Sequence, residues 1–503
     1  MNLVGFGLTL HDSSIAAYKD GKFLYRKAER QFNRKHAHGN IEWAKSVLSD
    51  WGIDNCESTW SSWLTGKNQQ KIVDGDKLDH HYTHALSSSI KFDVDLVLDF
   101  GAKGPADNEQ QHDFYNGMLR VHGRHVERYK EYPVPNVLCS VLNSTSFDHE
   151  IRARQFMMDC MANNKFAEFC DKVMETGKEP DNWADFVSGI DIPGKIMSLQ
   201  SYGMPDTEKI DSWMPLKFRN LAVISEINHT LPNKVDPNLI ATVHKFCEET
   251  VMQKAPHMPF YYSGGVAQNV VFNRAMLDQG HLPHIEPWAY DGGCSIGALN
   301  YLLDKHNIKR TDEWVQDDEA PVDQPSVYTL VEVCQLLAEG KVVGWYQGNG
   351  EVGPRALGNR SILFNPTLKD AKEKVNAIKK REWWRPFGAS VLENKASQFF
   401  DLPVSRHMLF NSNVLFSGIP GVTHVDGTCR HQTVPDNDTP FQWLLTYYEL
   451  ETDIPILLNT SLNQKGKPLC STIQQALDLF RSTDMDALCV GCLLYTSPSP
   501  RDS

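Results

Sequence analysis

Residues 351–366 read EVGPRALGNRSILFNP, and this stretch decides how the second half of the chain is interpreted. Arg355 and Arg360 lie among glycines and a proline, and an apolar run follows directly. Glycine and proline mark tight turns, whereas a short apolar run bounded by turn residues is typical of a buried strand. The pattern therefore predicts a buried strand next to a turn that carries two guanidinium groups.

Further cationic and hydrogen-bonding residues follow this turn. They are Lys379, Lys380, Arg381, Arg385 and Arg430, and a later loop, NTSLN, adds Asn459, Thr460, Ser461 and Asn463. A basic cluster is commonly a solvated face or a nucleic-acid patch. Because these arginines alternate with turns, apolar strands and the aromatic pair Trp383–Trp384, we expect them to point into a cleft. Guanidinium groups bind phosphate through paired hydrogen bonds, so the set suits two polyanions such as ATP and a small acyl phosphate.

Composition places the chain in an ordinary class. Its 503 residues allow several domains, and 41% hydrophobic and 22% charged residues indicate a soluble globular protein. We expect no membrane span and no signal peptide, because Met1 leads directly into a predicted strand. Eleven cysteines without framework spacing indicate a reduced, cytoplasmic chain, and the lone CxxC at Cys489 and Cys492 is interpreted as strand thiols. The net charge of −13 argues against non-specific coating of nucleic acid.

Turn and periodicity signals divide the chain. Lys19-Asp20-Gly21-Lys22 predicts a hairpin turn, 257–277 predicts strand, glycine turn and helix, and 287–306 predicts a loop followed by a helix. The fold class is predicted as α/β. We expect a first domain over 1–312, a linker over 313–326, a second domain over 327–492, and a disordered or non-native tail over 493–503.

A histidine-rich stretch, DHHYTHA, gives the first domain a candidate metal site. On a helix, His80 and His84 are four residues apart and project from one face. Asp99, at the end of the apolar strand predicted within 93–101, and Asp291, in the loop before the helix of 287–306, are candidate carboxylate ligands. Two histidines and a carboxylate with open positions suit Fe(II) or a catalytic zinc. Solvated or capping histidines are the plainer interpretation.

Polar loops in the same domain favour nucleotide binding. Gly264 and Gly265 separate a predicted strand from a helix, where the backbone can approach a phosphate, and Asn269 offers a further hydrogen bond. In GLTLHDSSIAA, His11 has the chemistry of a base. Several such loops resemble the phosphate loops of the actin-like ATPase fold.

Several long motifs, in order, resemble the NodU/CmcH family of O-carbamoyltransferases. The motifs of the second half are GPRALGNRSIL, KKREWWRPFG, DGTCRHQTV and LLNTSLNQKGKP. Those of the first half are HDSSIAAYKDG, ERQFNRKH, DHHYTHA, GKIMSLQSYG, SGGVAQN and DGGCSIGAL. The resemblance covers roughly residues 1–490, and agreement of several long motifs makes it specific.

The resemblance implies an actin-like (ASKHA, duplicated RNase H-like) N-terminal domain and a YrdC-like C-terminal domain. It also implies a two-step reaction. The second domain would convert carbamoyl phosphate and ATP, with Mg²⁺, into carbamoyl-adenylate. The first, holding a divalent metal that is Fe(II) in relatives, would pass the carbamoyl group to a substrate hydroxyl.

Site residues carry over one at a time. Arg355, Lys380, Arg385, Arg430 and Ser461 match the family's carbamoyl-donor residues. In the first domain, His80, His84 and Asp291 match metal ligands with Asp99 nearby, His11 matches the histidine that deprotonates the acceptor, and Lys35 matches a lysine at the transfer site. Two stretches depart from the family pattern, 101–117 and the PGK at 193–195, and both are expected near the acceptor pocket.

The acceptor and the competing classes stay open. The leading interpretation is 5-hydroxymethylcytosine in DNA, with a hydroxyl of a sugar or natural product as the alternative. Trp383–Trp384 could stack a base, although such pairs more often fill a core. The other classes are a non-catalytic actin-like ATPase, a nucleic-acid binding module, and threonylcarbamoyl transfer to tRNA. An oligomer is compatible with the sequence.

Overall fold

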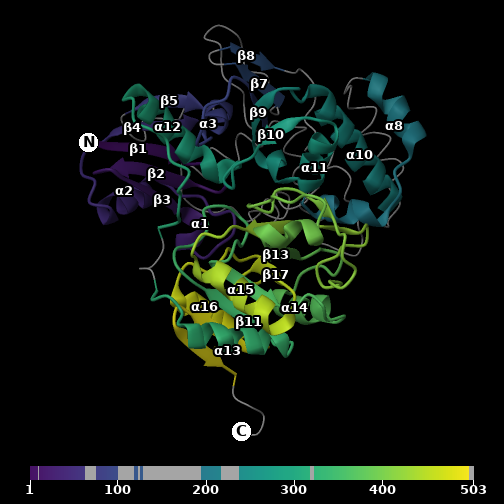
Figure 1. Ribbon diagram of the computed structural model, residues 1–503. Helices are drawn as coiled ribbons and strands as arrows, with labels where there is room; N and C mark the ends of the chain where they lie inside the picture. Colours follow the sequence, from purple (N-terminus) through teal and green to yellow (C-terminus); the bar gives the residue numbers. More distant parts are fainter. Residues whose placement is uncertain are drawn as a thin grey trace. The chain divides into compact units, whose positions relative to one another are not determined.

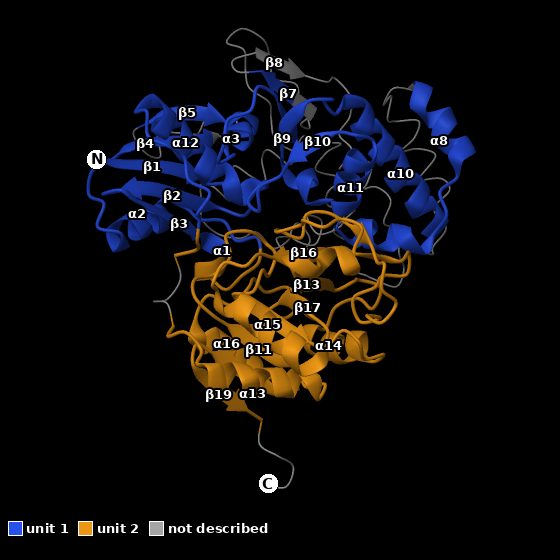
Figure 2. Cartoon of the chain, viewed as in Figure 1, with its two compact units in different colours: residues 1–29, 36–314 blue, residues 30–35, 315–503 orange. Residues whose placement is uncertain are grey.

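A computed structural model describes residues 1–9, 11–62, 75–99, 118–122, 125–128, 194–216, 237–317 and 322–497. The chain forms two compact units (Figure 2). Unit 1 comprises Met1–Glu29 and His36–Trp314, and unit 2 comprises Arg30–Lys35 and Val315–Ser503. The division after Trp314 falls inside the stretch expected to be a linker. The short segment Arg30–Lys35 belongs to unit 2, which the sequence did not predict.

Unit 1 begins with a five-stranded mixed sheet in the order β3-β2-β1-β4-β5 (Figure 1). Its strands are β1 (Asn2–Gly7), β2 (Ser14–Lys19), β3 (Lys22–Lys27), β4 (Glu57–Ser62) and β5 (Asp76–Asp79). Strands β1, β2 and β3 pair antiparallel, whereas β4 is parallel to β1 and β5 to β4. Lys19 pairs with Lys22, and Asp20 and Gly21 between them have φ of 51° and 81°. The predicted hairpin turn is therefore confirmed, with the positive φ values that a two-residue type I′ loop requires.

A second five-stranded sheet in unit 1 repeats this arrangement in the order β10-β9-β6-β7-β8. Its strands are β6 (Asp95–Leu98), β7 (Met118–His122), β8 (His125–Arg128), β9 (Pro259–Ser263) and β10 (Leu282–His284). Strands β6, β7 and β8 again pair antiparallel, and β9 and β10 again continue in parallel from β6. The two sheets of unit 1 thus share one strand order and one set of directions.

Helices accompany both sheets. They are α1 (Ala28–Gln31), α2 (Ile41–Asp50), α3 (His80–Leu86), α8 (Thr207–Trp213), α10 (Pro237–Lys254), α11 (Val270–Asp278) and α12 (Cys294–Lys305). The helices predicted within 257–277 and 287–306 are confirmed as α11 and α12. In Figure 1, α12 lies beside β1, β4 and α3.

Glycines allow α12 to lie this close to its neighbours. A Cβ on Gly5 of β1 would stand 2.2 Å from the Ser295 carbonyl oxygen, and a Cβ on Gly297 would stand 1.8 Å from that of Thr83. Both distances are far below van der Waals contact, so any side chain at either position would push α12 away from its neighbours. This packing positions the residues at the start of α12.

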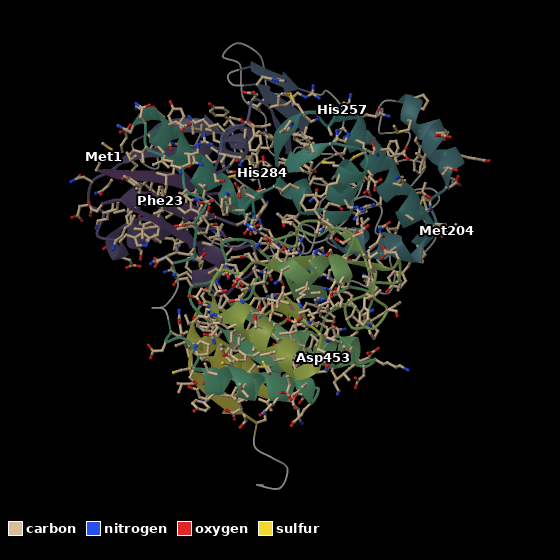
Figure 3. The ribbon with its side chains drawn as sticks, in the orientation of Figure 1. Met1, Phe23, Met204, His257, His284 and Asp453 are labelled. Carbon is tan, nitrogen blue, oxygen red and sulfur yellow. The ribbon has the colours of Figure 1, made fainter. Side chains whose placement is uncertain are left out.

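Aromatic packing holds the last residues of unit 1, where the chain passes to unit 2. Trp314 is buried, and its ring lies 5.4 Å from that of Phe23 and 6.2 Å from that of Tyr25, both of β3. Figure 3 labels Phe23, and it also labels Met204, whose side chain is 79% exposed. Edge-on aromatic pairs of this kind stabilise a fold beyond their buried area. The first residues of the expected linker are therefore packed against β3.

Unit 2 contains a seven-stranded mixed sheet in the order β16-β13-β17-β12-β11-β18-β19. The strands are β11 (Val343–Tyr346), β12 (Arg360–Phe364), β13 (Gly388–Leu392), β16 (His431–Val434), β17 (Ile456–Ser461), β18 (Ala487–Val490) and β19 (Leu493–Thr496). Strand β12 follows the GPRALG turn as predicted, and all five of its residues are buried. A short pair, β14 (Ser412–Asn413) with β15 (Thr428–Cys429), stands apart from this sheet.

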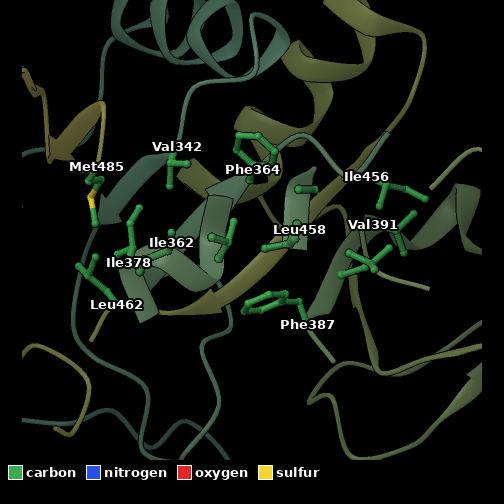
Figure 4. Close-up of a cluster of buried hydrophobic side chains, with 14 of the residues drawn as sticks. Val342, Ile362, Phe364, Ile378, Phe387, Val391, Ile456, Leu458, Leu462 and Met485 are labelled. Atoms are coloured by element: carbon green, nitrogen blue, oxygen red, sulfur yellow. The ribbon is translucent and has the colours of Figure 1, made fainter. Parts of the chain in front are cut away.

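Two hydrophobic cores sandwich the sheet of unit 2. One joins it to α13 (Val327–Ala338) and α15 (Pro440–Thr452). The other joins it to α14 (Ala371–Lys379) and α16 (Ile473–Arg481), and Figure 4 shows Ile378 of α14 with Ile362, Phe364 and Leu458 of the strands. A sheet with helices on both faces makes unit 2 an α/β layered structure. The predicted α/β class is confirmed at this level.

The end of the chain differs from the expectation. Residues 493–496 form β19 and pair antiparallel with β18, and Tyr495 packs against the core. The sequence predicts a disordered or non-native tail, but disorder does not begin at 493, because an edge strand recovers backbone hydrogen bonds there. Cys489 lies in β18, and the exposed Cys492 lies in the turn, both as free thiols. Residues 498–503 lie outside the described part of the chain.

Within the described ranges, no helix combines the length and the apolar character that a crossing of the bilayer requires.

We expect the substitution Gly5→Ala to destabilise unit 1. Its Cβ would collide with the backbone at Ser295 and Leu299 of α12, which cannot rotate away as a side chain can. The expected loss is about 1–3 kcal/mol, the usual cost of overpacking a core. Urea denaturation followed by tryptophan fluorescence measures it. Gly194→Ala is the matched control, because a Cβ there meets nothing within 4 Å. Equal stability of the two variants would contradict the packing argument.

Candidate functional site

The two histidines predicted as a pair meet inside unit 1. Asp79 caps α3 by accepting hydrogen bonds from the backbone N–H groups of His81 and Tyr82. One turn then separates His80 from His84, whose Nε2 atoms lie 3.2 Å apart. Both imidazoles are fully buried. The predicted helical spacing is confirmed, and the alternative of solvated histidines is wrong.

Two carboxylates complete the histidine cluster. The Oδ2 atom of Asp99, which follows β6, lies 2.9 Å from His80 Nε2 and 3.6 Å from His84 Nε2. Asp291 starts the 3-10 turn η4 (Asp291–Gly293) before α12, and its Oδ1 lies 3.4 Å from His84 Nε2 and 3.8 Å from His80 Nε2. One ligand atom from each of the four residues lies within 4.8 Å of the others. A set of two imidazoles and two carboxylates has the chemistry to hold a divalent metal.

Charge pairing shifts the pKa of His80, His84 and Asp99. Burial alone would raise the pKa of Asp99, but hydrogen bonds with His80 and His84 outweigh it and hold that pKa well below its usual range. Burial would likewise lower the pKa of His80, whereas Cys294, Asp291 and Asp99 raise it to about 10. Strongly shifted groups that converge in a buried cluster are typical of functional sites.

His11 lies beside this cluster. Its Nε2 is 3.5 Å from Asp291 Oδ2, and its Nδ1 is 2.9 Å from Asp12 Oδ2. Asp12 also lies 2.8 Å from His36 Nδ1 and 3.4 Å from the buried Lys27 Nζ. A carboxylate on Nδ1 orients an imidazole and leaves Nε2 directed at the cluster. The sequence analysis singled out His11 but missed Asp12, although it is the next residue in the LHDSS stretch.

The glycine turn after β9 contacts Asp99 of the same cluster. Gly264 has φ of 93°, and a Cβ there would stand 2.0 Å from the Leu98 carbonyl oxygen, so only glycine fits against the end of β6. The backbone N–H of Gly265 donates to Asp99 Oδ1 at 3.4 Å. Asn269 caps α11 by accepting from Val271 and Phe272, and its amide lies 3.1 Å from His244 Nε2. The structure thus gives these residues packing and capping roles, and phosphate binding by them stays a prediction.

In unit 2, a single carboxylate organises the turn of residues 351–360. Glu351 Oε1 accepts hydrogen bonds from the backbone N–H groups of Leu357, Asn359 and Arg360 at 2.7, 2.9 and 3.2 Å. Arg30 belongs to the segment Arg30–Lys35, which is part of unit 2. Its guanidinium donates to the carbonyl oxygens of Glu351 and Gly353. These contacts fix the half-buried Arg355 on a defined loop.

Arg360 does not behave as predicted. Its side chain is fully buried, and the guanidinium donates to the carbonyl oxygens of Gln347, Gly348 and Cys470 while it stacks 3.6 Å above the Tyr346 ring. The structure contradicts the expectation that Arg360 points into a cleft. The guanidinium N–H groups donate to backbone carbonyl oxygens, so Arg360 stabilises the turn from its buried side.

Lys379 is the lysine that meets the NTSLN loop. Its Nζ donates to Ser461 Oγ at 3.0 Å, to the Asn463 carbonyl oxygen at 2.7 Å and to Asn463 Oδ1. Lys380 is the C-cap of α14 with φ of 51°, and its side chain is exposed. Both lysines belong to the cationic set that the sequence indicated, but the resemblance named Lys380 for the donor site, whereas Lys379 contacts the NTSLN loop. Helical periodicity carried the missing signal, because residues 375 and 378 are apolar and 379 shares their buried face.

Lys379, Arg381, Arg385 and Arg430 form what we call the cation cluster. Burial, and then Arg381, Arg385 and Lys35, hold the pKa of Lys379 well below its usual range. Burial, with Arg385 among the neighbouring cations, lowers the pKa of Arg430 to about 10. Glu382, an adjacent acid, lies 3.7 Å from Arg385 and 2.7 Å from Lys465. Among the described residues, the buried Nε atoms of Arg381 and Arg430 have no hydrogen-bond partner. The cluster therefore carries an excess of positive charge.

The other predicted residues of unit 2 lie on the same strands and loops. Asn459, in β17, is buried and donates to Ser390 Oγ at 2.8 Å and to the Ala356 carbonyl oxygen at 3.3 Å, which ties the turn of residues 351–360 to the sheet. Thr460 is buried in the next position of β17, and Ser461 donates to Asn463 Oδ1 at 2.7 Å. Their ligand-binding roles stay predictions.

Comparison with known proteins bears on these sites. The family described as "Carbamoyltransferase C-terminus" matches residues 334–497. The chain is 38% identical over 273 residues to the nodulation protein NolNO of Sinorhizobium fredii, covering 48% of this chain and 40% of the relative. It is 32% identical over 263 residues to the 3'-hydroxymethylcephem-O-carbamoyltransferase of Amycolatopsis lactamdurans, covering 49% and 51%. An uncharacterised protein of Methanocaldococcus jannaschii is 30% identical over 60% of this chain and 68% of its own length.

The chain belongs to the NodU/CmcH carbamoyltransferase family. It spans about half the length of most curated relatives it matches. The C-terminal family match includes β19, in agreement with the pairing of that strand.

Two solved structures also align with this family member. They are (R)-2-hydroxyglutaryl-CoA dehydratase component A of Acidaminococcus fermentans, with 15% identity over 61% of this chain and 99% of that one, and full-length HypF, with 12% identity over 60% and 56%. Their TM-scores are 0.34 and 0.35, too low to establish a shared fold.

The substitution Glu351→Ala is expected to unravel the turn of residues 351–360. Three backbone N–H groups would lose a charged acceptor, at a cost on the order of 2 kcal/mol or more. Glu351→Gln keeps an oxygen acceptor and should lose much less. Urea denaturation and amide hydrogen exchange at residues 357–360 report the two effects. If both variants exchange like the parent chain, the carboxylate does not organise the turn.

Proposed function

We propose that this chain is an O-carbamoyltransferase that works in two steps. In unit 2, carbamoyl phosphate and ATP give carbamoyl-adenylate, inorganic phosphate and pyrophosphate. In unit 1, the carbamoyl group passes from the adenylate to a substrate hydroxyl, and AMP leaves. Membership of the NodU/CmcH family supports this reaction class.

The cation cluster is the observation that carries the proposal. ATP and carbamoyl phosphate are both anions and repel one another, so a site that joins them must supply compensating positive charge. Lys379, Arg385 and Arg430 supply it, and Lys379 also donates to the hydroxyl of Ser461. Lys379 is buried and the two arginines are half-buried, and Arg385 destabilises the charged forms of Lys379 and Arg430, which a bound polyanion would relieve. Arg355 and Lys35 extend the site from the 351–360 turn and the segment Arg30–Lys35.

Atom balance defines the first step. A carbamate oxygen bonds to the α-phosphorus of ATP, and the bond to the leaving pyrophosphate breaks. Carbamoyl-adenylate keeps one phosphorus atom, which comes from ATP. The phosphorus of carbamoyl phosphate therefore leaves as inorganic phosphate, and one water is consumed. Cationic side chains that hold the reactants in line contribute to this step by orientation and charge neutralisation.

Unit 1 is suited to the transfer step. Its two sheets of identical strand order support the proposal of a duplicated RNase H-like, actin-like architecture. His80, His84, Asp99 and Asp291 fit a divalent metal, which we propose is Fe(II). When bound, this metal supplies a Lewis acid that polarises the carbamoyl oxygen. His11 Nε2, oriented through Asp12, takes the proton of the acceptor hydroxyl as that oxygen bonds to the carbamoyl carbon.

The acceptor is proposed to carry a hydroxymethyl group. The name of the Amycolatopsis relative specifies a 3'-hydroxymethylcephem acceptor. 5-Hydroxymethylcytosine in DNA presents the same primary alcohol and is our leading candidate, with a hydroxyl on a sugar or natural product as the alternative. Of the tryptophan pair, Trp383 is 74% exposed whereas Trp384 is buried, so Trp383 is the better candidate to stack on a base. Residues 101–117, expected near the acceptor, lie outside the described residues.

The competing function classes account less well for the buried cations of unit 2. A nucleic-acid binding module needs exposed cations, whereas Lys379 is buried. A non-catalytic actin-like ATPase has no use for the cation cluster of unit 2. Threonylcarbamoyl transfer to tRNA would require a threonine-derived donor in place of carbamoyl phosphate.

Pyrophosphate release tests the first step. The full chain should release pyrophosphate only when ATP, Mg²⁺ and carbamoyl phosphate are all present. Lys379→Met should lower the rate by on the order of 100-fold, because it removes a buried charge at the reacting phosphates. Lys380→Met, its exposed neighbour, should stay within about threefold of the parent chain. Circular dichroism checks that both variants fold. Equal rates for the two variants, or no pyrophosphate from the parent chain, would refute the donor site.

Mass spectrometry identifies the acceptor. The chain is incubated with ATP and carbamoyl phosphate and, in separate reactions, hydroxymethylated duplex DNA, single-stranded DNA, the free nucleotide, and sugars or natural products that carry hydroxymethyl groups. We expect the mass of one carbamoyl group to be added to 5-hydroxymethylcytosine. Its addition only to small molecules would replace DNA as the acceptor and leave the reaction class intact.

A further inference from the structure

Cys294 lies against the same two histidines that face Asp99 and Asp291. Its Sγ is 3.7 Å from His80 Nδ1 and 3.6 Å from His84 Nε2, and the side chain is fully buried. Ligand atoms of His80, His84 and Cys294 all lie within 4.8 Å of one another. No spacing in the sequence indicates a ligand role for this cysteine.

The sulfur and the carboxylates form two different ligand sets. His80, His84, Asp99 and Asp291 form one group, and His80, His84 and Cys294 form another. The histidine pair is common to both, so it lies between an oxygen-rich side and a sulfur side. Carboxylate and imidazole suit harder divalent metals, whereas a thiolate selects softer ions such as Zn²⁺ and Cd²⁺.

Backbone packing fixes the position of the sulfur. Cys294 is the first residue of α12, directly after η4. A Cβ on Gly293 would stand 2.1 Å from the Trp288 carbonyl oxygen, and one on Gly297 would stand 1.8 Å from that of Thr83. The helix start is therefore held on both sides of Cys294, and its side chain is presented to the histidines by the fold.

We propose that Cys294 is a metal ligand, which with His80 and His84 forms a thiolate site for a soft divalent cation. The inference rests on the metal role proposed for unit 1. It adds Cys294 as a ligand and a preference for soft divalent cations. On binding, the S–H bond breaks, a sulfur–metal bond forms, and the proton is released to solvent. Zinc or cadmium then occupies the sulfur side of the histidine pair, whereas iron occupies the oxygen side.

Cobalt absorption tests the inference. Co²⁺ is titrated into the metal-free full-length chain, and we expect a thiolate-to-cobalt charge-transfer band in the near ultraviolet. Cys294→Ser and His84→Ala should both lose this band. Cys492→Ser, which removes an exposed thiol, should keep it and controls for adventitious binding. A cobalt-loaded parent chain without the band, or a band that survives Cys294→Ser, would overturn the assignment.

Zinc X-ray absorption gives a second measurement that needs no variant. Zinc bound to the parent chain should show a sulfur neighbour at about 2.3 Å together with nitrogen neighbours. Coordination by nitrogen and oxygen alone overturns the role of Cys294 but leaves the proposed carbamoyl transfer intact. Failure to bind any divalent metal overturns both this inference and the metal role in unit 1. Pyrophosphate release by unit 2 does not depend on either metal result, so it tests the donor step separately.

Discussion

The contact of α12 with β1 and α3 is the constraint on which the site in unit 1 depends. Asp291 and Cys294 lie at the start of this helix, more than 200 residues along the chain from the histidines they meet. They reach His80 and His84 because Gly5 and Gly297 have no side chains to hold the backbones apart. Helix surfaces normally approach through interlocking side chains, and glycine at the contact permits a shorter distance. The ligand geometry is thus a consequence of backbone packing.

The two units differ in how they balance their buried charge, because unit 1 pairs cations with anions whereas unit 2 gathers cations. In unit 1, the imidazoles of His80 and His84 converge with the carboxylates of Asp99 and Asp291. In unit 2, the cation cluster gathers lysine and arginine side chains that lower one another's pKa. Burying charge is costly unless a partner compensates for it. We propose that phosphate anions supply the compensating charge in unit 2, and that the buried imidazoles and carboxylates of unit 1 hold a metal cation.

Arg360 and Lys379 show how sequence reasoning succeeds and fails in unit 2. The sequence indicated that cations would converge near the NTSLN loop, and they do. It could not show that Arg360 binds backbone carbonyl oxygens, because Arg355 and Arg360 lie in the same glycine-containing turn. Similarly, Lys379 and Lys380 are adjacent in sequence, and only the end of α14 decides which one is buried.

By itself, the sequence determined the features that depend on neighbouring residues. The Asp20-Gly21 hairpin, the helical face shared by His80 and His84, and the strand after GPRALG follow from backbone preferences and periodicity. Only the tertiary structure decided that β19 extends the sheet, that Asp12 orients His11, that Arg30–Lys35 belongs to unit 2, and that a cysteine faces the histidine pair. These features depend on which backbones approach one another across long stretches of chain, and local preferences carry no information about that distance.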